Sequence, residues 1–264
     1  MSVDLQKYKT AQRFAYSCAE KAAAQLAVGM TERDVAQLLK ESLNAGGATD
    51  FLHRPFAWFA ERSGFLNMRG FRDYLPSNRT LTANDVVVLD VSPIVDGHIG
   101  DIGLSVSLSP HAGLEKAKAS LRKTRALIPQ LFMSDRPLGE VWKAVEQQLN
   151  ADGFQNAYTR YPFSVLGHRV PLINRRTNFL SSLPVTYLSW FGNTAYLMFL
   201  KYGISKQLIR KNSKQAKEGV WAIEPHLSGD GFGAKFEEIL VVEKDRAYWL
   251  DDDVPHMRGY TATA

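Results

Sequence analysis

Apolar residues recur at helical spacing in the first part of the chain. Residues 4–27 carry Ala, Leu and Phe at this spacing and contain no proline, which predicts a helix. Thr31 is a suitable N-cap, and Asp34 stands where a capping box needs an acceptor. A second helix should therefore run from this cap to about Ala45 and end at the Gly46-Gly47 pair.

A β-branched apolar run, Val86-Val-Val-Leu89, predicts a buried strand that leads into a hairpin. Asp96-Gly97 is a two-residue turn signal, and pairing the chain around it puts Ser92 opposite Asp101. Side chains on one strand face repeat every second residue, so Asp90 shares a face with Asp101. Two carboxylates converging there repel each other unless a cation lies between them. The alternative is a pair of solvated aspartates beside a surface turn.

A second hairpin repeats this pairing of acids. With Asp230-Gly231 as its turn, Glu224 lies opposite Glu237. Between the two hairpins in sequence, His168 follows a short apolar run. Two Asp, two Glu and one His form a mixed oxygen and nitrogen set that suits two divalent transition metals a few Å apart.

The chain also contains an internal repeat. Residues 35–47 align with residues 141–153 at a constant offset, and a longer helix precedes each copy, the second over about residues 112–131. Each copy leads toward one of the acidic hairpins. Two similar halves predict pseudo-two-fold symmetry with the metals on the axis, although two amphipathic helices can also resemble each other by chance.

The order of these motifs resembles the methionine aminopeptidase and prolidase family of "pita-bread" metallohydrolases, over about residues 8 to 250. DVSPIVDGHIGD is similar to the family's first metal hairpin, WAIEP to its Glu-Pro strand and AKFEEILVV to its last metal strand. The resemblance implies an α/β (α+β) fold with a curved antiparallel sheet backed by helices. It implies that five side chains hold a dinuclear centre: Asp90, Asp101, His168, Glu224 and Glu237.

Such a centre implies a hydrolase resembling aminopeptidases and Xaa-Pro peptidases, with a water between the two metals as nucleophile. Manganese, iron, cobalt and zinc all suit the ligand set. Glu224 can also take the proton of the water. His226, two residues later on the same strand face, is the second candidate proton carrier. His53 and His256 give no signal beyond that of loop residues.

Two positions depart from the family pattern. Counting from the metal ligands, the outer histidines of the family fall on Arg72 and Arg175 here. Arginine stays charged and cannot shuttle a proton, but it can bind a carboxylate or phosphate through two hydrogen bonds. Both arginines are therefore candidate substrate-binding residues, unless they are ordinary surface arginines. The departure puts ordinary aminopeptidase activity in question.

Length and composition fit one cytoplasmic enzyme domain. The metal ligands span much of the 264-residue chain, so residues 1–264 are interpreted as a single catalytic domain of the short methionine aminopeptidase size. A single cysteine fits a reducing compartment, and the N-terminus lacks an apolar signal core, so no secretion is expected. The net charge of +5 is modest, and nucleic-acid binding is not expected.

An aromatic-rich segment, residues 178–204, separates His168 from Glu224. Its first 23 residues carry no formal charge and are long enough to suggest a membrane span, but Pro184 and Gly192 argue against one. Both ends must also return to one metal centre. We expect a flap over the pocket or the interface of a homodimer, with plain core filling as the alternative.

Two rivals remain to the peptidase interpretation. The first is a non-peptidase metalloenzyme, a lyase or another hydrolase, which acts at the same centre on a small anionic substrate. The absence of both outer histidines favours it. The second is a non-catalytic binding protein on the same scaffold, which the presence of all five ligands argues against. The expected partner is thus a peptide or another small molecule.

Overall fold

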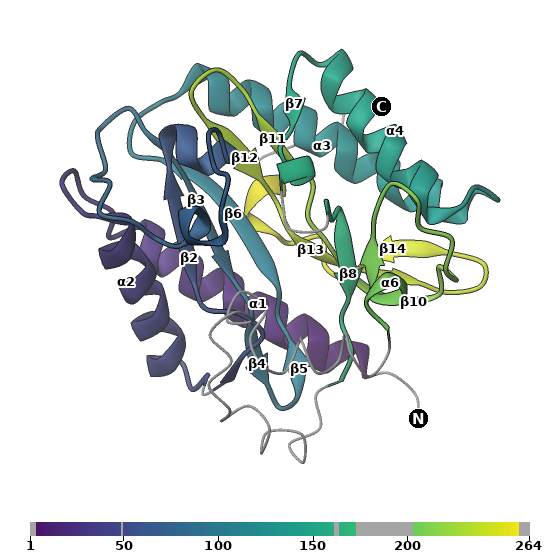
Figure 1. The fold of residues 1–264 in the computed structure, drawn as a ribbon. Helices are drawn as coiled ribbons and strands as arrows, with labels where there is room; N and C mark the ends of the chain where they lie inside the picture. The colour runs from purple at the N-terminus through teal and green to yellow at the C-terminus, as the bar shows by residue number, and fades with distance from the viewer. Residues whose placement is uncertain (1–3, 49, 161–163, 173–202, 259–264) are drawn as a thin grey trace.

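The structure is a computed structural model and describes residues 4–48, 50–160, 164–172 and 203–258 (Figure 1). The helices in this part of the chain are α1 (Leu5–Ala23), α2 (Glu32–Ala45), α3 (Ala112–Met133), α4 (Leu138–Ala151) and the short α6 (Ile204–Gln207). The 3-10 turns are η1 (Ala60–Gly64), η2 (Phe71–Tyr74), η3 (Tyr158–Arg160) and η6 (Pro255–Met257). The strands are β1 (Asp50–Phe51), β2 (Phe56–Phe59), β3 (Val86–Val91), β4 (Pro93–Val95), β5 (His98–Ile99), β6 (Ile102–Ser107), β7 (Gln155–Asn156), β8 (Gly167–Arg169), β9 (Leu208–Ile209), β10 (Gly219–Ile223), β11 (His226–Ser228), β12 (Gly233–Lys235), β13 (Glu238–Val242) and β14 (Ala247–Trp249).

The first two helices form as their sequence predicts. Asp4 caps α1, and its side chain accepts a hydrogen bond from the backbone of Lys7. α1 ends at Ala23, earlier than expected, because the chain leaves it in turns that lead to Gly29, whose φ is +94°. α2 carries the predicted capping box between Thr31 and Asp34.

The predicted helix repeat is confirmed. α2 and α4 each contain 14 residues, and they begin at the aligned positions Glu32 and Leu138. α1 packs against α2, and α3 packs against α4. In Figure 1 the first pair lies at the lower left and the second at the upper right, with the strands between them.

The strands form antiparallel sheets, as expected. β3 lies between β2 and β6, and the order β14-β13-β10-β8-β9 forms the larger sheet of the second half. Each half has its own apolar core under its helix pair. One core packs α1 and α2 on β2, β3 and β6 through residues such as Leu39 and Val87. The other packs α3 and α4 on β10 and β13 through residues such as Val145 and Trp221. The two cores therefore flank the region where the hairpins meet.

The aromatic-rich segment lies almost wholly outside the described residues. Its predicted role as a flap or interface over 178–204 therefore stays a prediction. In the part of the chain that the structure describes, no helix is both long and apolar enough to cross a membrane.

Candidate metal centre

The first hairpin brings Asp90 and Asp101 together through the predicted register. β3 pairs with β6 with Asp90 opposite Gly103, so Asp101 lies diagonally across from Asp90. At the tip of the hairpin φ is positive for both Asp96 (48°) and Gly97 (78°). These values are typical of a tight two-residue turn, which fixes the register of the flanking strands. The two carboxylates thus reach the same buried face, Asp101 with no exposed surface.

The second hairpin places its two glutamates in the same way. β10 and β13 pair as far as Ile223 and Glu238, and the same register continues in β11 and β12. Glu224 therefore lies opposite Glu237, as predicted. An isolated antiparallel bridge between Gly103 and Glu237 joins this hairpin to the first. The two halves of the chain consequently meet where their acids meet.

His168 reaches the same point from β8, where it lies opposite Ala222 of β10. Its Nε2 atom is 3.1 Å from Oδ2 of Asp101 and 3.9 Å from Oε1 of Glu237. Its Nδ1 atom is 3.0 Å from the carbonyl oxygen of Arg169. Because a carbonyl only accepts, this contact assigns the proton to Nδ1 and leaves Nε2 as the ligand atom, as is usual for metal-binding histidines.

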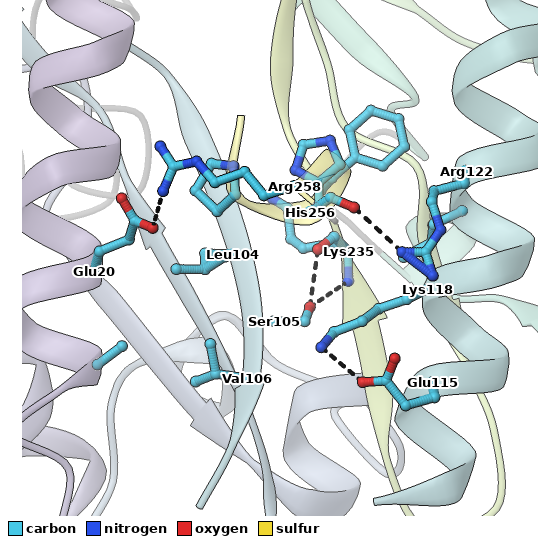
Figure 2. A pocket seen from close by; sticks show the side chains of 14 residues that line it. Glu20, Leu104, Ser105, Val106, Glu115, Lys118, Arg122, Lys235, His256 and Arg258 are labelled. Carbon is cyan, nitrogen blue, oxygen red and sulfur yellow. Dashed lines mark hydrogen bonds and ion pairs between the residues drawn. The ribbon is translucent and has the colours of Figure 1, made fainter. Parts of the chain in front are cut away.

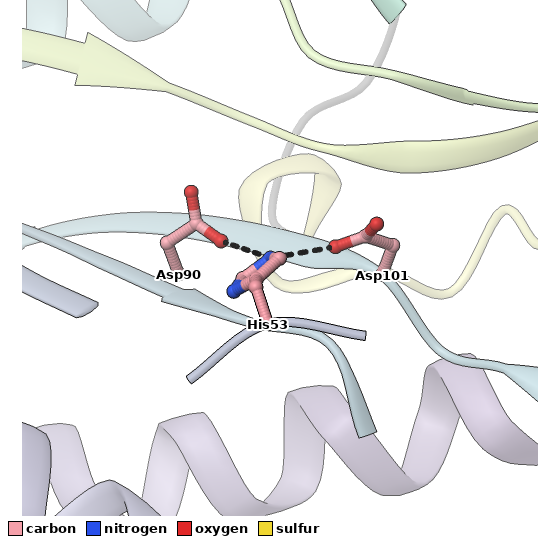
Figure 3. Close-up of side chains that lie close together, drawn as sticks. All are labelled: His53, Asp90 and Asp101. Atoms are coloured by element: carbon pink, nitrogen blue, oxygen red, sulfur yellow. Dashed lines mark ion pairs between the residues drawn. The ribbon is translucent and has the colours of Figure 1, made fainter. Parts of the chain in front are cut away.

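His53 is a residue of this site that sequence reasoning missed. Figure 3 shows its ring between the two aspartates, with Nε2 3.3 Å from Oδ1 of Asp90 and 3.4 Å from Oδ1 of Asp101. Burial lowers the pKa of His53, but the charges of the two aspartates outweigh burial and raise it to about 9. Phe56 of β2 pairs with Asp90 of β3, and this long-range pairing carries His53 to the centre. No local pattern around His53 signals that contact.

The ligand atoms of these side chains form overlapping groups. Within the described residues, three groups have all their ligand atoms within 4.8 Å of one another: His53, Asp90 and Asp101; Asp101, His168 and Glu237; Asp90, Glu224 and Glu237. All five side chains that the sequence predicts as ligands are therefore brought together. Each group shares a carboxylate with another, an arrangement that allows one carboxylate to contact two cations.

The electrostatics of the cluster fit a divalent cation. Burial, together with the charge of Asp101, raises the pKa of Glu237 well above its usual value, and burial also raises that of Glu224. Among the described residues, no group makes a hydrogen bond of normal geometry to Oδ1 of Asp90 or to either carboxylate oxygen of Asp101, although histidine nitrogens approach both. Buried carboxylate oxygens without donors are costly unless a cation binds them. The oxygen and nitrogen donor set suits a divalent transition metal.

Lys235 is the other side chain that sequence reasoning did not place here. It ends β12, two residues before Glu237, and its side chain is fully buried. Its Nζ atom lies 2.7 Å from Asp90, 3.0 Å from Glu224 and 2.9 Å from Glu237. Side chains two residues apart on a strand point to the same face, so Lys235 points to the centre as Glu237 does. This strand periodicity is the sequence signal from which the direction of Lys235 could have been predicted.

The remaining predicted residues have different surroundings. Arg72 lies in η2 and is exposed, and within the described residues no hydrogen bond or ion pair joins its guanidinium to the cluster. Arg175 lies outside the described residues. His226 is fully buried in β11, with Nε2 2.6 Å from the carbonyl oxygen of Ser63. Burial lowers the pKa of His226 to about 3, so the ring is neutral and donates through Nε2.

A cavity of about 390 Å³ lies between α1, β6 and α3 (Figure 2). Ser105 in its wall accepts a hydrogen bond from the amide of Lys235 and donates one to the carbonyl of the same residue, both at 2.8 Å. Glu20 and Arg258 at its rim form an ion pair with each other at 2.6 Å. Ser105, a residue of the cavity wall, therefore holds the backbone of Lys235 in the position from which its side chain reaches the carboxylates.

Comparison with known protein families identifies the family of this chain. Residues 6–244 match the model of metallopeptidase family M24, and the chain belongs to that family. No curated protein sequence matches it.

Solved structures share the fold at low sequence identity. An X-Pro aminopeptidase from Thermotoga maritima matches with a TM-score of 0.68 and 17% identity, over 94% of this chain and 60% of its own. A prolidase from Pyrococcus furiosus matches with a TM-score of 0.63 and 17% identity, over 91% of this chain and 61% of its own. An Xaa-Pro dipeptidase from Bacillus anthracis matches with a TM-score of 0.66 and 15% identity, over 95% and 61%. The predicted pita-bread fold is thereby confirmed, and the chain spans about 60% of the length of these proteins.

Proposed function

We propose that this protein is a metal-dependent hydrolase that cleaves peptide or related amide bonds. The observation that carries the proposal is the convergence of five side chains in a chain of family M24: Asp90, Asp101, His168, Glu224 and Glu237. These residues would hold divalent metal, with manganese, iron, cobalt and zinc as candidates and two ions as the full complement. His53 would add a nitrogen atom next to Asp90 and Asp101.

Divalent metal bound here would supply Lewis acidity, which activates water at neutral pH and polarises a carbonyl group. The protein's own residues would position that chemistry. Glu224, whose pKa burial raises, would accept a proton from the attacking water. His226 is the second proposed proton carrier; its pKa of about 3 and the hydrogen bond from Nε2 to Ser63 leave the unprotonated Nδ1 as its only proton acceptor. Because the carboxylates are buried, bulk water would be excluded from the oxygens that would bind the metal.

The wider proposal keeps the organisation that the sequence indicates. Residues 1–264 would form a single catalytic domain, with Arg72 and Arg175 contacting the substrate. Residues 178–204 would cover the pocket or form the interface of a homodimer. A cytoplasmic location accords with the single cysteine.

A small anionic substrate is the second candidate, and one feature of the structure favours it. A groove of about 710 Å³ adjoins His53; among the described residues that line it are Arg33, Lys40 and Arg54, and none of them is acidic. Cations without acidic neighbours attract carboxylates and phosphates. A substrate whose acidic group occupied this groove would extend toward the side of the centre that His53 forms.

The assay is hydrolysis of Met-, Leu- and Xaa-Pro-peptides, and of acidic amides and esters, by protein reconstituted with each candidate metal. We expect metal-dependent turnover that Asp101→Asn reduces by at least ~100-fold, because even groups outside the ligand shell change metal affinity by 10–100-fold. Metal content should fall in the same variant.

Asp96→Asn is the matched control, since Asp96 lies exposed at the tip of the same hairpin and asparagine tolerates its positive φ. It should keep full turnover and metal content. Metal-loaded protein that cleaves none of the peptides but cleaves acidic substrates would favour the second candidate. Wild-type protein that binds no divalent metal would refute the proposed function.

A further inference from the structure

Lys235 occupies a position among the carboxylates that is suited to a cation. Its three carboxylate partners, Asp90, Glu224 and Glu237, are the members of one of the three ligand groups. An ammonium group has three N–H donors, and here three carboxylates surround it at 2.7–3.0 Å. One ligand group of the centre is thus already bound to a positive charge that belongs to the chain.

The surroundings hold this lysine in place. Ser105 fixes its backbone with two hydrogen bonds. Its aliphatic stem packs over Gly103, where an added Cβ atom would approach the Cε atom of the lysine to 2.6 Å, so a larger residue there would displace the lysine side chain. Across the hairpin, His226 lies opposite Lys235, and its Nε2 atom is 2.6 Å from the carbonyl oxygen of Ser63. The slot is therefore shaped for an extended lysine that points at the carboxylates.

We propose that Lys235 is a built-in cation that competes with one of the two metal ions, so that the centre binds one metal tightly and the second only by displacing the ammonium group. The inference rests on the proposed function and concerns how the same site is loaded. The two groups that contain Asp101 each include only one partner of Lys235, and because they share the Asp101 carboxylate the first ion would bind there. A second ion at the remaining group would share Asp90, Glu224 and Glu237 with an ammonium, and like charges a few Å apart repel strongly in a buried site.

Charge counting agrees with competition between Lys235 and a second metal ion. Asp90, Asp101, Glu224 and Glu237 carry four negative charges when ionised, and Lys235 balances one of them. With the ammonium group in place, one divalent ion leaves a net charge of −1 and two leave +1, so two ions reach neutrality only if the ammonium group leaves the cluster. The lysine should also allow the metal-free chain to fold, because it offsets repulsion among buried carboxylates that would otherwise lack a partner.

The test is titration of EDTA-treated, full-length protein with Mn²⁺, followed by calorimetry and by metal analysis after dialysis. Wild-type protein should show one tight site and a second site that is weaker or not measurable. Lys235→Met, which keeps the length of the side chain without its charge, should strengthen the second site about 10- to 100-fold, the range typical of changes next to metal ligands. Lys235→Arg should retain the wild-type pattern.

Lys123→Met is the control, because Lys123 is exposed and pairs only with Asp152 among the contacts that the structure describes. It should titrate like wild type. If Lys235→Met folds only with metal present, protein purified in Mn²⁺ should contain two ions per chain, which supports the proposal equally.

Two equally tight sites in the wild-type protein would overturn the inference while leaving the proposed function intact. So would a Lys235→Met protein whose second site is unchanged. Wild-type protein without any metal site would instead overturn both. The wild-type titration by itself separates two equally tight sites from no site, and the Lys235→Met titration tests the role of the lysine.

Discussion

Asp251 is the residue that ties the C-terminal segment to the first helix. Its side chain is 3% exposed and lies 3.1 Å from Nζ of Lys9, while Arg13 donates two hydrogen bonds to it. Burial raises the pKa of Asp251, but the hydrogen bonds from Arg13 and Lys9 outweigh burial and lower it below its usual value. A lowered pKa means that the ionised form stabilises the folded state.

The variant Asp251→Asn should therefore lose stability in a pH-dependent way. At pH 7 we expect a loss of about 1–3 kcal/mol in the free energy of unfolding, the usual range for hydrogen bonds to charged groups. The difference from wild type should be complete above about pH 4, the pKa of an unfolded aspartate, and should shrink as the pH falls toward the folded pKa. Urea unfolding at several pH values measures it.

Asp245→Asn, at an exposed aspartate near the β13–β14 turn, is the control and should change little at any pH. A difference between Asp251→Asn and wild type that stayed constant from pH 7 to pH 3 would contradict this account of the charge.

The positions of single side chains could be predicted where the alternation of faces along a strand determines them. They could not be predicted where they depend on contacts between segments distant in sequence. Asp101 and Glu237 follow from turn signals and a period of two. His53 does not, because its position depends on the pairing of β2 with β3 across a long loop. Lys235 shares the strand face of Glu237, so its direction could be read from the sequence. The contact of Lys235 with carboxylates of both hairpins could not be predicted from the sequence, because it depends on tertiary packing.

At the scale of single elements, the capping box of α2 is the clearest case in which sequence determines structure. Oγ1 of Thr31 accepts a hydrogen bond from the amide of Asp34 at 3.1 Å, and the amide of Thr31 donates to the Asp34 carboxylate at 2.8 Å. Thr31→Ala should lower the free energy of unfolding by about 1 kcal/mol, since it removes an acceptor for a helix N-terminal amide. Thermal and urea unfolding at neutral pH measure the change.

The matched control is Thr10→Ala, an exposed threonine inside α1 where alanine is the better helix former. It should leave stability unchanged or raise it slightly. Equal losses of unfolding free energy in the two variants would show that replacing any helix threonine has this effect, and that the cap at Thr31 does not cause it.

Element boundaries were harder to predict than element types. The sequence indicates one strand through Glu224 and another from Ala234 to Val242, but each is broken near its acid, into β10 and β11 and into β12 and β13. Pro225, which cannot donate a ladder hydrogen bond, accounts for the first break. The second break has no local cause and accompanies the bridge from Glu237 to Gly103 of the other half. Interaction between the halves therefore overrides local strand propensity at the site itself.

At the scale of the whole molecule, the chain is two similar halves joined at the cluster of acids. Asp90 and Asp101 belong to the half built on α1 and α2, whereas His168, Glu224 and Glu237 belong to the half built on α3 and α4. The internal repeat and the order of the ligands allowed this plan to be predicted from sequence. The aromatic-rich segment 178–204 could not be assigned, because its first 23 residues carry no formal charge and show no clear periodicity, which fits a flap, an interface or a core equally well.

Because the proposed ligands come from both halves, bound metal should stabilise the molecule as a whole. Binding to the folded state alone adds about 2.7 kcal/mol to the free energy of unfolding at a metal concentration 100 times Kd. Mn²⁺ should therefore raise the Tm of wild-type protein in a concentration-dependent way, and EDTA should reverse the rise. Hydrogen exchange should slow in strands of both halves, β3 and β10 among them, and not only around one hairpin.

Asp101→Asn should lose most of the metal-induced rise in Tm, because Asp101 belongs to two of the ligand groups, whereas Asp96→Asn should keep it. An equal rise in Tm for both variants would show that the ion acts elsewhere on the protein, and slowed exchange in one half alone would show that the cluster does not link the halves.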